Sequence, residues 1–267
     1  MAIEVFNRYE RKFLIRNDCY LKLRERLLEY MEPDAHSRDG EFYTICNIYY
    51  DTKQNELISR SLEKPVYKEK LRLRSYGVVT PEDKVFLEIK KKYNKKVNKR
   101  RTKLKLAEAY AFVESGELPV YQSYMNAQVL RELQYFLKRM NMELKPALFL
   151  SYDRVAMFGK DNKEFRITFD RNITTRRYDL GLHYGVYGDK LLAEDEWIME
   201  VKIENAMPMW MTKILSELQI YPVSFSKYGT EYTRFMLGNR QSGDEPEGEA
   251  AEEEVAATKQ TTIGKEK

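Results

Sequence analysis

KEKLRLRSYG, residues 68–77, is the stretch that decides the fold. Lysine or arginine stands at every second position from Lys68 to Arg74, and a leucine lies on each side of Arg72. Because successive side chains of a β-strand point to opposite faces, this alternation predicts a strand with one cationic face and one apolar face.

Two later segments repeat the pattern. KVFLEIKKK, residues 84–92, predicts an apolar face opposite a face that carries Glu88 and Lys90, and in VNKRRTKLKL, residues 97–106, every second residue from Lys99 onward is a cation. Like charges on one strand face repel each other unless counter-charges lie between them. If the apolar faces pack against helices, the cations must point into a concave sheet or a barrel lumen, which would attract a polyanion.

The formal net charge of +4, from 46 Lys and Arg against 42 Asp and Glu, conceals where the charge lies. Residues 60–105 hold 17 basic and 5 acidic residues, whereas residues 238–267 hold eight acidic and four basic residues and no aromatic residue. A segment of the second kind cannot bury enough apolar surface to offset its chain entropy. We therefore predict one domain over residues 1–237 and a disordered acidic tail over residues 238–267.

The composition also excludes several classes of protein. A hydrophobic content of 43% argues against a fully disordered chain. No apolar run reaches the roughly 18–20 residues that a membrane span needs, and the polar N-terminus has no signal-peptide core. Two cysteines and two histidines provide neither a disulfide framework nor a multi-histidine zinc site. We expect a cytoplasmic protein without a membrane span.

Eight segments rich in alternating Tyr, Val, Ile and Phe predict β-strands. They are residues 5–15, 43–50, 67–76, 85–92, 96–104, 147–158, 165–170 and 197–203. Apolar residues at helical spacing predict helices over residues 17–30, 106–114, 127–140 and 208–218. The predicted fold class is α+β, an antiparallel eight-stranded β-barrel with helices packed around the outside.

A glutamate two residues before a lysine occurs on three predicted strands: Glu10 with Lys12, Glu88 with Lys90, and Glu200 with Lys202. Glutamates in a cationic lumen either pair with neighbouring cations or hold a hard divalent cation, such as Mg²⁺ or Mn²⁺, that bridges to phosphate oxygens. Both interpretations stay open, and Glu200 is favoured as the metal ligand.

Further cations stand in aromatic-rich segments. Arg154 and Arg166 lie in predicted strands, where each could form a structural ion pair with Asp153 or Asp170, and Lys227 is expected near a turn. The sequence contains no GxxxxGK[ST], GxSxG or HExxH motif. Phosphoryl transfer requires none of these, because positioning and electrostatic stabilisation supply most of its catalysis.

The chain resembles a known family through motifs in this order: RYERKF, CNIYYDT, EKLRLRSYG, VFLEIKKK, SYDRVAMF, FRITFD, IMEVKI and SFSKYG. They are similar to those of the VTC-type polyphosphate polymerase domain, within the triphosphate tunnel metalloenzyme (CYTH-like) superfamily, and the likeness covers residues 5–237. The resemblance implies a barrel whose tunnel binds triphosphate or polyphosphate. It also implies transfer of the γ-phosphate of ATP onto a growing polyphosphate chain, with Mn²⁺ or Mg²⁺ as cofactor.

The resemblance further implies roles for individual residues. The catalytic, phosphate-binding residues would be Arg72, Arg74, Lys90, Arg154, Arg166 and Lys227. Other contacts to ATP or phosphate would come from Glu10, Lys12, Lys99, Arg101, Tyr152, Lys202 and Ser226, and Glu200 would bind the metal.

The sequence departs from the superfamily pattern in two ways. Hydrolases of the superfamily begin with Glu-x-Glu-x-Lys, whereas Arg8 occupies the first of these positions here, which favours transfer over hydrolysis. Eukaryotic polymerases of this type also carry a regulatory domain and membrane spans, and this sequence has neither. We therefore expect a bacterial-style, soluble, stand-alone form.

ATP and inorganic polyphosphate or triphosphate are the expected partners. One alternative is a triphosphatase of the same fold that cleaves inorganic or nucleoside triphosphates, and another is a non-catalytic module that binds polyphosphate. A nucleic-acid binder is disfavoured, because a narrow tunnel excludes a duplex and the aromatic residues alternate opposite the cations, as core residues do.

Overall fold

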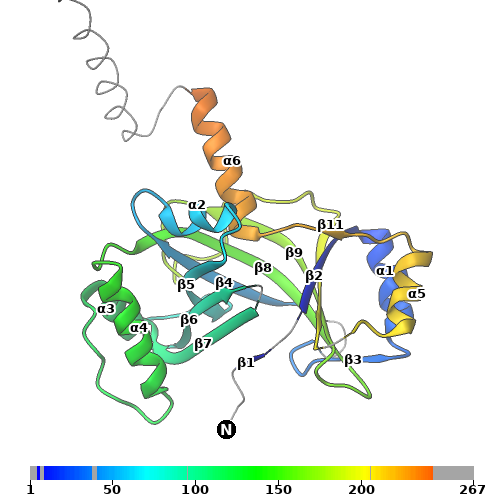
Figure 1. The fold of residues 1–267 in the computed structure, drawn as a ribbon, viewed down its shortest axis with the longest axis horizontal. Coiled ribbons are helices and arrows are strands. Elements are labelled where there is room, and N and C mark those ends of the chain that lie inside the picture. The colour runs from blue at the N-terminus through cyan, green and yellow to red at the C-terminus, as the bar shows by residue number, and fades with distance from the viewer. Residues whose placement is uncertain (1–4, 7–8, 38–40, 95, 205, 243–267) are drawn as a thin grey trace, which may run out of the picture. The chain divides into compact units, whose positions relative to one another are not determined.

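The computed structural model describes residues 5–6, 9–37, 41–94, 96–204 and 206–242 (Figure 1). The chain divides into two units, residues 1–230 and 231–267, and each is described by itself. The described part of the second unit is helical, because helix α6 (Lys227–Ser242) continues into it. No helix among the described residues is long and apolar enough to cross a membrane.

The domain boundary expected at residue 237 stays a prediction. Helix α6 continues to Ser242, and residues 243–267 of the expected acidic tail lie outside the described residues.

The first unit is built on one antiparallel sheet of 12 strands. Eight strands are long: β2 (Tyr9–Arg16), β4 (Tyr43–Asp51), β5 (Tyr67–Tyr76), β6 (Lys84–Tyr93), β7 (Lys96–Lys105), β8 (Lys145–Gly159), β9 (Arg166–Arg176) and β11 (Glu196–Ile203). Four are short: β1 (Val5–Phe6), β3 (Met31–Pro33), β10 (Asp189–Lys190) and β12 (Pro222–Val223). Neighbours follow the order β1-β7-β6-β5-β4-β8-β9-β11-β2-β12, with β10 beside β9 and β3 beside β8.

The remaining helices are α1 (Asn17–Leu27), α2 (Glu56–Leu62), α3 (Leu106–Ser115), α4 (Ala127–Arg139) and α5 (Met209–Glu217). The eight long strands and the helices α1, α3, α4 and α5 correspond to the predicted elements. Helices α2 and α6 were not predicted; the start of α2 depends on a contact that periodicity does not report. The buried carboxylate of Asp51 accepts hydrogen bonds from the backbone N–H groups of Leu57 and Ile58 in its first turn.

The helices cover one face of the sheet in two places (Figure 1). Helices α3 and α4 share a core with β4–β7, in which Leu133 packs with Leu71 and Ile89. Helices α1 and α5 share a second core with β2, β9 and β11 around the buried Trp197. The α+β arrangement with helices on the outside is thus confirmed, and the face of the sheet that α1, α3, α4 and α5 leave uncovered is called the inner face below.

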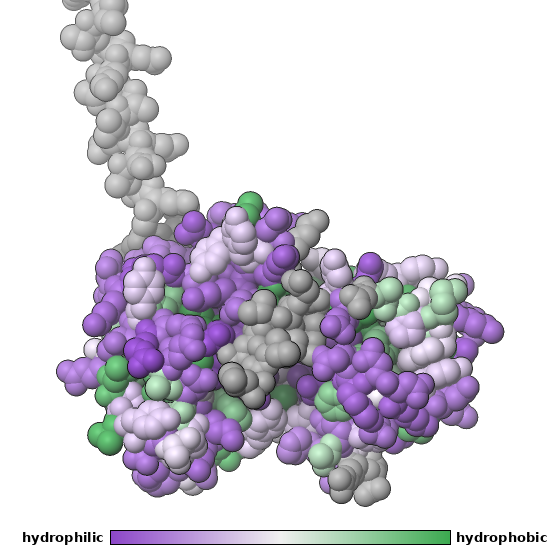
Figure 2. Space-filling view, turned by 60° about the horizontal axis from the view of Figure 1, so that its bottom comes forward, coloured by the Kyte–Doolittle hydropathy of each residue, from purple (hydrophilic) through white to green (hydrophobic). Residues whose placement is uncertain are grey.

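Among the described residues, the hydrogen-bonded path of the sheet is open rather than a closed ring. It begins at β1, which pairs with β7, and ends at β12, which pairs with β2. Side chains nevertheless meet across the inner face: Lys90 on β6 lies 3.8 Å from Glu10 on β2. The sheet is therefore barrel-like, and charged side chains bridge its two sides. Hydrophilic residues predominate on the side of the molecule seen in Figure 2.

Candidate active site

Strand register brings the predicted site residues together on the inner face. Each inner-face position of β5 lies opposite a residue of β6, which in turn lies opposite one of β7. The resulting rungs are Lys70–Lys90–Lys99, Arg72–Glu88–Arg101 and Arg74–Phe86–Lys103. On the other side of the sheet, rungs across β2, β11, β9 and β8 are Glu10–Lys202–Arg166–Phe158 and Lys12–Glu200–Thr168–Ala156.

Glu88 organises the first group of cations. Its carboxylate accepts a 2.6 Å hydrogen bond from Nε of Arg72 and lies 2.7 Å from Nζ of Lys99. Guanidinium nitrogens of Arg74 and Arg101 both lie 3.9 Å away. Burial opposes the ionisation of Glu88, but these cations outweigh it and hold its pKa well below the usual range. One carboxylate therefore positions four cations while neutralising the charge of only one.

Asp170 organises the second group. Its two oxygens accept hydrogen bonds of 2.6 and 2.8 Å from Arg154, and Nζ of Lys227 donates a third of 2.6 Å. Burial opposes ionisation, but Arg154 and Lys227 lower the pKa of Asp170 to about 2. The ring of Tyr152 lies beneath both cations, and its hydroxyl accepts a hydrogen bond from Arg74. Tyr152 thus connects the two groups.

The structure confirms one of the ion pairs expected from the sequence and gives a different partner for the other arginine. The pairing of Arg154 with Asp170 is confirmed, but Arg166 lies 3.8 Å from Asp34 instead of pairing with Asp153 or Asp170. Lys227 is the first residue of α6 rather than part of a turn.

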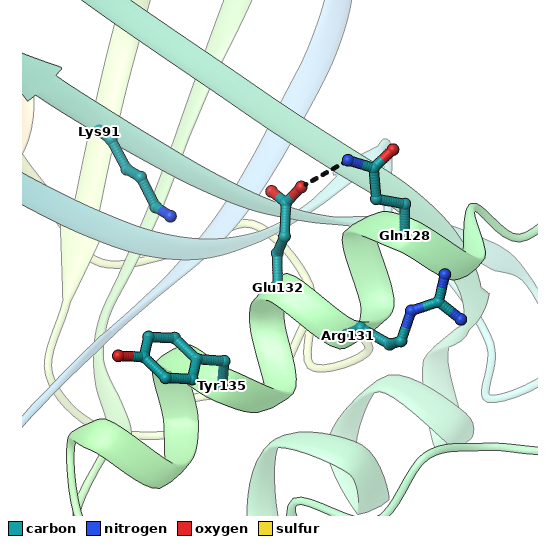
Figure 3. A pocket seen from close by; sticks show the side chains of 5 residues that line it. All are labelled: Lys91, Gln128, Arg131, Glu132 and Tyr135. Carbon is teal, nitrogen blue, oxygen red and sulfur yellow. Dashed lines mark hydrogen bonds between the residues drawn. The ribbon is translucent and has the colours of Figure 1, made fainter.

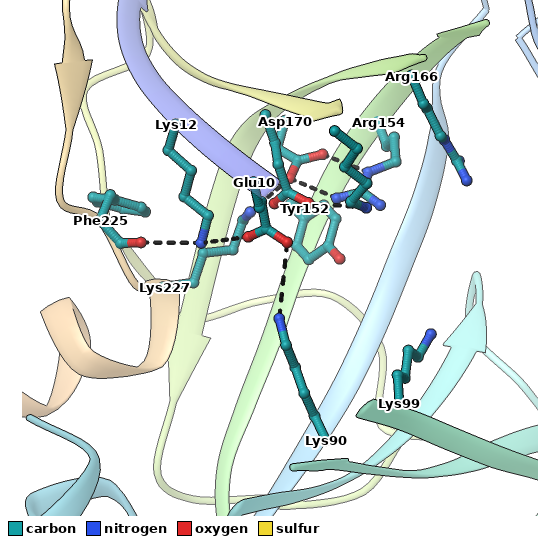
Figure 4. Close-up of polar contacts among 12 residues, drawn as sticks. Glu10, Lys12, Lys90, Lys99, Tyr152, Arg154, Arg166, Asp170, Phe225 and Lys227 are labelled. Carbon is teal, nitrogen blue, oxygen red and sulfur yellow. Dashed lines mark hydrogen bonds and ion pairs between the residues drawn. The ribbon is translucent and has the colours of Figure 1, made fainter. Parts of the chain in front are cut away.

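Glu10 and Glu200 lie diagonally across the β2–β11 pair, each beside lysines. Glu10 lies 3.3 Å from Lys12, which also donates to the carbonyl oxygen of Phe225, as Figure 4 shows. Glu200 lies 2.9 Å from Lys202. Burial opposes its ionisation, but Lys202 and Lys12 keep the pKa of Glu200 well below the usual range, so this carboxylate is ionised.

These two carboxylates are the ones that suit a divalent metal on the inner face. Among the described residues, no group of three His, Cys, Asp or Glu side chains is arranged to hold a metal ion. Mg²⁺ is usually bound through one or two carboxylates together with substrate phosphates. The donor set therefore fits a metal that arrives with phosphate and not a cage made by the protein alone.

Several inner-face groups lack a protein partner for their charge or hydrogen bonds. Within the described part of the chain, Nε of Arg166 and Oγ1 of Thr168 are buried without a hydrogen-bond partner. Nζ of Lys70 makes a 3.5 Å contact with Oγ of Ser226 and lies 5.7 Å from the ring of Tyr228. Burial lowers the pKa of Lys70 to about 8, and the nearby Lys90 contributes to the shift. Such groups are suited to an anionic ligand.

The described inner face thus gathers all the residues expected from the sequence. The cations of the inner face outnumber its carboxylates Glu10, Glu88, Asp170 and Glu200; they include Lys12, Lys68, Lys70, Arg72, Arg74, Lys90, Lys92, Lys99, Arg101, Lys103, Arg154, Arg166, Lys202 and Lys227. Arg8, at the position where the superfamily hydrolases have a glutamate, lies outside the described residues.

Sequence reasoning did not select two residues of this site, Lys70 and Asn47. Lys70 belongs to the alternating stretch that predicted the strand, and that alternation could have included it. The partners of Glu88 and Asp170 depend on the order of the strands in the sheet. The alternation of residues within one strand does not reveal that order. Asn47, whose side chain accepts a 2.9 Å hydrogen bond from Arg74, had no signal in the sequence.

Two hollows of about 350 Å³ lie away from these residues. One, beside α4, is lined by Lys91, Gln128, Arg131, Glu132 and Tyr135 (Figure 3). The other lies between α2, β5 and the end of α4. Neither contains a predicted site residue, so the inner face is the stronger candidate for the active site.

Comparisons with known proteins agree with this fold. The VTC domain family matches residues 7–236. A candidate adenylate cyclase from Bacillus halodurans is similar in structure with a TM-score of 0.52 and 17% identity, over 84% of this chain and 96% of that one. A candidate adenylyl cyclase from Hippeastrum with a dominant triphosphatase activity gives a TM-score of 0.48 and 12% identity, over 90% of this chain and 98% of that one.

A protein from Pyrococcus horikoshii gives a TM-score of 0.39 and 16% identity, over 85% of this chain and 99% of that one. A search of curated proteins gives no match. The family match covers most of the chain and the whole of the described inner face. The chain belongs to the VTC domain family and has the fold of the triphosphate tunnel metalloenzyme (CYTH-like) superfamily.

Proposed function

We propose that this protein is a polyphosphate polymerase that transfers the γ-phosphate of ATP onto a growing inorganic polyphosphate chain. The observation that supports it most is the charge of the inner face, where cations outnumber carboxylates and Glu88 holds four cations in place. A fixed array of cations stabilises the charge that a phosphoryl group carries in the transition state, without having to reorganise. Membership of the VTC domain family points to the same chemistry.

Each group of cations has a role in this proposal. Arg72, Arg74 and Lys99 bind the triphosphate of ATP, because their donors are already oriented by Glu88. Arg154 and Lys227, oriented by Asp170, bind the phosphates on the other side of the face. Two phosphate chains, one bound by each group of cations, can be aligned for in-line transfer. The reaction then takes place between two bound and oriented groups and does not require a bimolecular encounter.

A divalent metal fits beside this array. Glu200 and Glu10 would hold Mg²⁺ or Mn²⁺ together with phosphate oxygens, and the ion would supply further neutralisation of phosphate charge. Lys12 and Lys202, which contact these carboxylates in the free protein, also remain available to phosphate.

A triphosphatase is the second candidate, and one feature of the sequence favours the polymerase over it. Arg8 replaces the first glutamate of the hydrolase motif and so removes one potential metal ligand. Fewer carboxylates near the phosphates leave fewer groups to bind and activate water. This favours a phosphate acceptor over water. Whether the protein works in the cytoplasm stays a prediction.

Product analysis tests the proposal. The protein is incubated with ATP and either Mn²⁺ or Mg²⁺, and the products are resolved on a polyacrylamide gel. We expect polyphosphate chains from the wild type and a loss of at least tenfold in Arg72→Ala, about 1.4 kcal/mol of transition-state stabilisation. Arg11→Ala is the matched control, because Arg11 is exposed on the opposite face of β2.

The two candidate functions give different products. Release of orthophosphate without chains would select the triphosphatase, and binding without turnover under either metal would select a non-catalytic binding module. Wild-type activity in Arg72→Ala would remove that residue from the mechanism.

A further inference from the structure

The side chains of the inner face change from cationic to aromatic along the direction of its strands. On β5 its successive residues are Lys68, Lys70, Arg72, Arg74 and Tyr76, so one end begins with lysines and the other finishes with a tyrosine. Neighbouring positions on one face of a strand are about 7 Å apart. The gradient therefore extends over the length of a nucleoside triphosphate or longer.

The lysine end has like charges directly opposite each other. Lys68 lies opposite Lys92, and Lys70 lies opposite Lys90. Burial lowers the pKa of Lys68, and the nearby Lys92 and Lys90 lower it further. Like charges at opposed positions destabilise a sheet. Bound phosphates would offset this repulsion and an uncharged group would not, so this end is suited to a chain of phosphates.

The opposite end carries four rings: His36 from the loop before β4, Tyr43 from β4, Tyr76 from β5 and Phe86 from β6. His36 and Tyr76 are nearly parallel with ring centroids 5.9 Å apart, and Tyr43 and Phe86 both lie 6.0 Å from Tyr76. Tyr76 remains 47% exposed. These rings are neighbours that belong to neither core, and the exposed part of Tyr76 is accessible to a ligand.

Asp34 helps to position two of these rings, those of Tyr43 and His36. Its carboxylate accepts hydrogen bonds from the Tyr43 hydroxyl, at 3.3 Å, and from the backbone N–H of His36, at 3.1 Å. The carboxylate itself is buried and also lies 3.8 Å from Arg166, one of the phosphate-binding candidates. Asp34 thus connects two of the rings, His36 and Tyr43, to one cation of the inner face, Arg166.

Cations border the rings on the side of the phosphate array. The guanidinium of Arg101 lies 4.5 Å from the centre of the Phe86 ring, and Phe86 lies directly opposite Arg74. A base stacked on Tyr76 would thus have its phosphates attached one and two positions further along β5, at Arg74 and Arg72. Aromatic side chains stack on nucleobases at a gain of about 1–3 kcal/mol per base.

We propose that the aromatic end, defined by His36, Tyr43, Tyr76 and Phe86, binds the nucleobase of the nucleoside triphosphate. Its phosphates then extend toward the lysine end. This inference rests on the proposed function for the identity of the ligand, and it assigns a direction to the site: nucleotide enters at the aromatic end, and the phosphate chain leaves past Lys70 and Lys90.

Calorimetric titration with ATP and with inorganic triphosphate, in buffer with EDTA to prevent turnover, tests this subsite. Inorganic triphosphate has the same phosphates but no base. In Tyr76→Leu we expect ATP affinity to fall about tenfold while triphosphate affinity is unchanged. Tyr76→Phe keeps the ring and should keep the affinity for ATP. Tyr93→Leu is the matched control, because Tyr93 is 63% exposed at the other end of β6.

The outcomes separate this inference from the proposed function. Equal loss of ATP and triphosphate affinity in Tyr76→Leu, or no loss of either, would overturn the base subsite. A selective loss of ATP affinity supports the subsite even if the wild type releases only orthophosphate, a result that would refute polymerisation alone. Failure of the wild type to bind either ligand would refute both.

Discussion

Binding of ATP to the inner face should take up protons at pH 8. Two lysines of the site are partly neutral in the free protein. Burial lowers the pKa of Lys99 to about 7 even though Glu88 opposes the shift, and burial lowers that of Lys70 to about 8. Phosphate favours the charged form of a lysine and so raises its pKa. The side chain of Lys99 remains 36% exposed, so a bound phosphate can reach it.

The expected number of protons follows from these pKa values. At pH 8 roughly nine-tenths of Lys99 and about half of Lys70 are neutral, so charging both takes up about one to one and a half protons. The terminal phosphate of a nucleotide, with a pKa of about 6, is already ionised at pH 8 and releases none. At pH 6 both lysines are already charged, and no uptake is expected. Because the bound state holds more protons, ATP affinity should fall about fiftyfold from pH 8 to pH 9 if both lysines are charged in the complex.

The assay is calorimetric titration of ATP, in EDTA, in several buffers that differ in ionisation enthalpy. The dependence of the heat on that enthalpy gives the number of protons. The control is the double variant Lys70→Arg, Lys99→Arg, which keeps both charges at every pH because arginine does not deprotonate. Equal uptake in the wild type and in this variant, or no uptake by the wild type at pH 8, would refute the reasoning.

Three further predictions concern stability and salt. Glu88→Gln leaves buried cations without their counter-charge and should destabilise the protein by about 3 kcal/mol in urea unfolding; added triphosphate should recover part of this loss, and an unchanged midpoint would contradict the role given to Glu88. Asp51→Ala removes the acceptor for the first turn of α2 and for the Tyr228 hydroxyl, and should cost about 2–4 kcal/mol in the same assay without changing the affinity for triphosphate. Added salt should weaken triphosphate binding steeply, because exposed charges are screened; salt-independent affinity would exclude a mainly electrostatic site.

The sequence predicted the strands and the face of each cation because both depend on local alternation. Lys70, Arg72 and Arg74 point to one face of β5, with Leu71 and Leu73 on the other, as the pattern required. The same rule selected the two strands that follow. Helices α3 and α4 were also predictable, because their apolar spacing reflects the core that they cover.

Contacts between distant segments could not be predicted in this way. That Glu88 joins cations from β5 and β7, or that Asp170 joins Arg154 to Lys227, depends on strand order and register. Helix α2 depends on one carboxylate, that of Asp51, rather than on a repeated spacing. The resemblance named Lys227, but not the aspartate that holds it.

The fate of the γ-phosphate tests the central claim most directly. The protein is incubated with a divalent metal and ATP that is radiolabelled in the γ-phosphate, and chains, orthophosphate and ADP are separated and quantified. We predict that the label enters chains longer than triphosphate and that one ADP forms for each phosphate incorporated. Label that appears in orthophosphate alone, with no labelled chain under Mn²⁺ or Mg²⁺, would contradict the account.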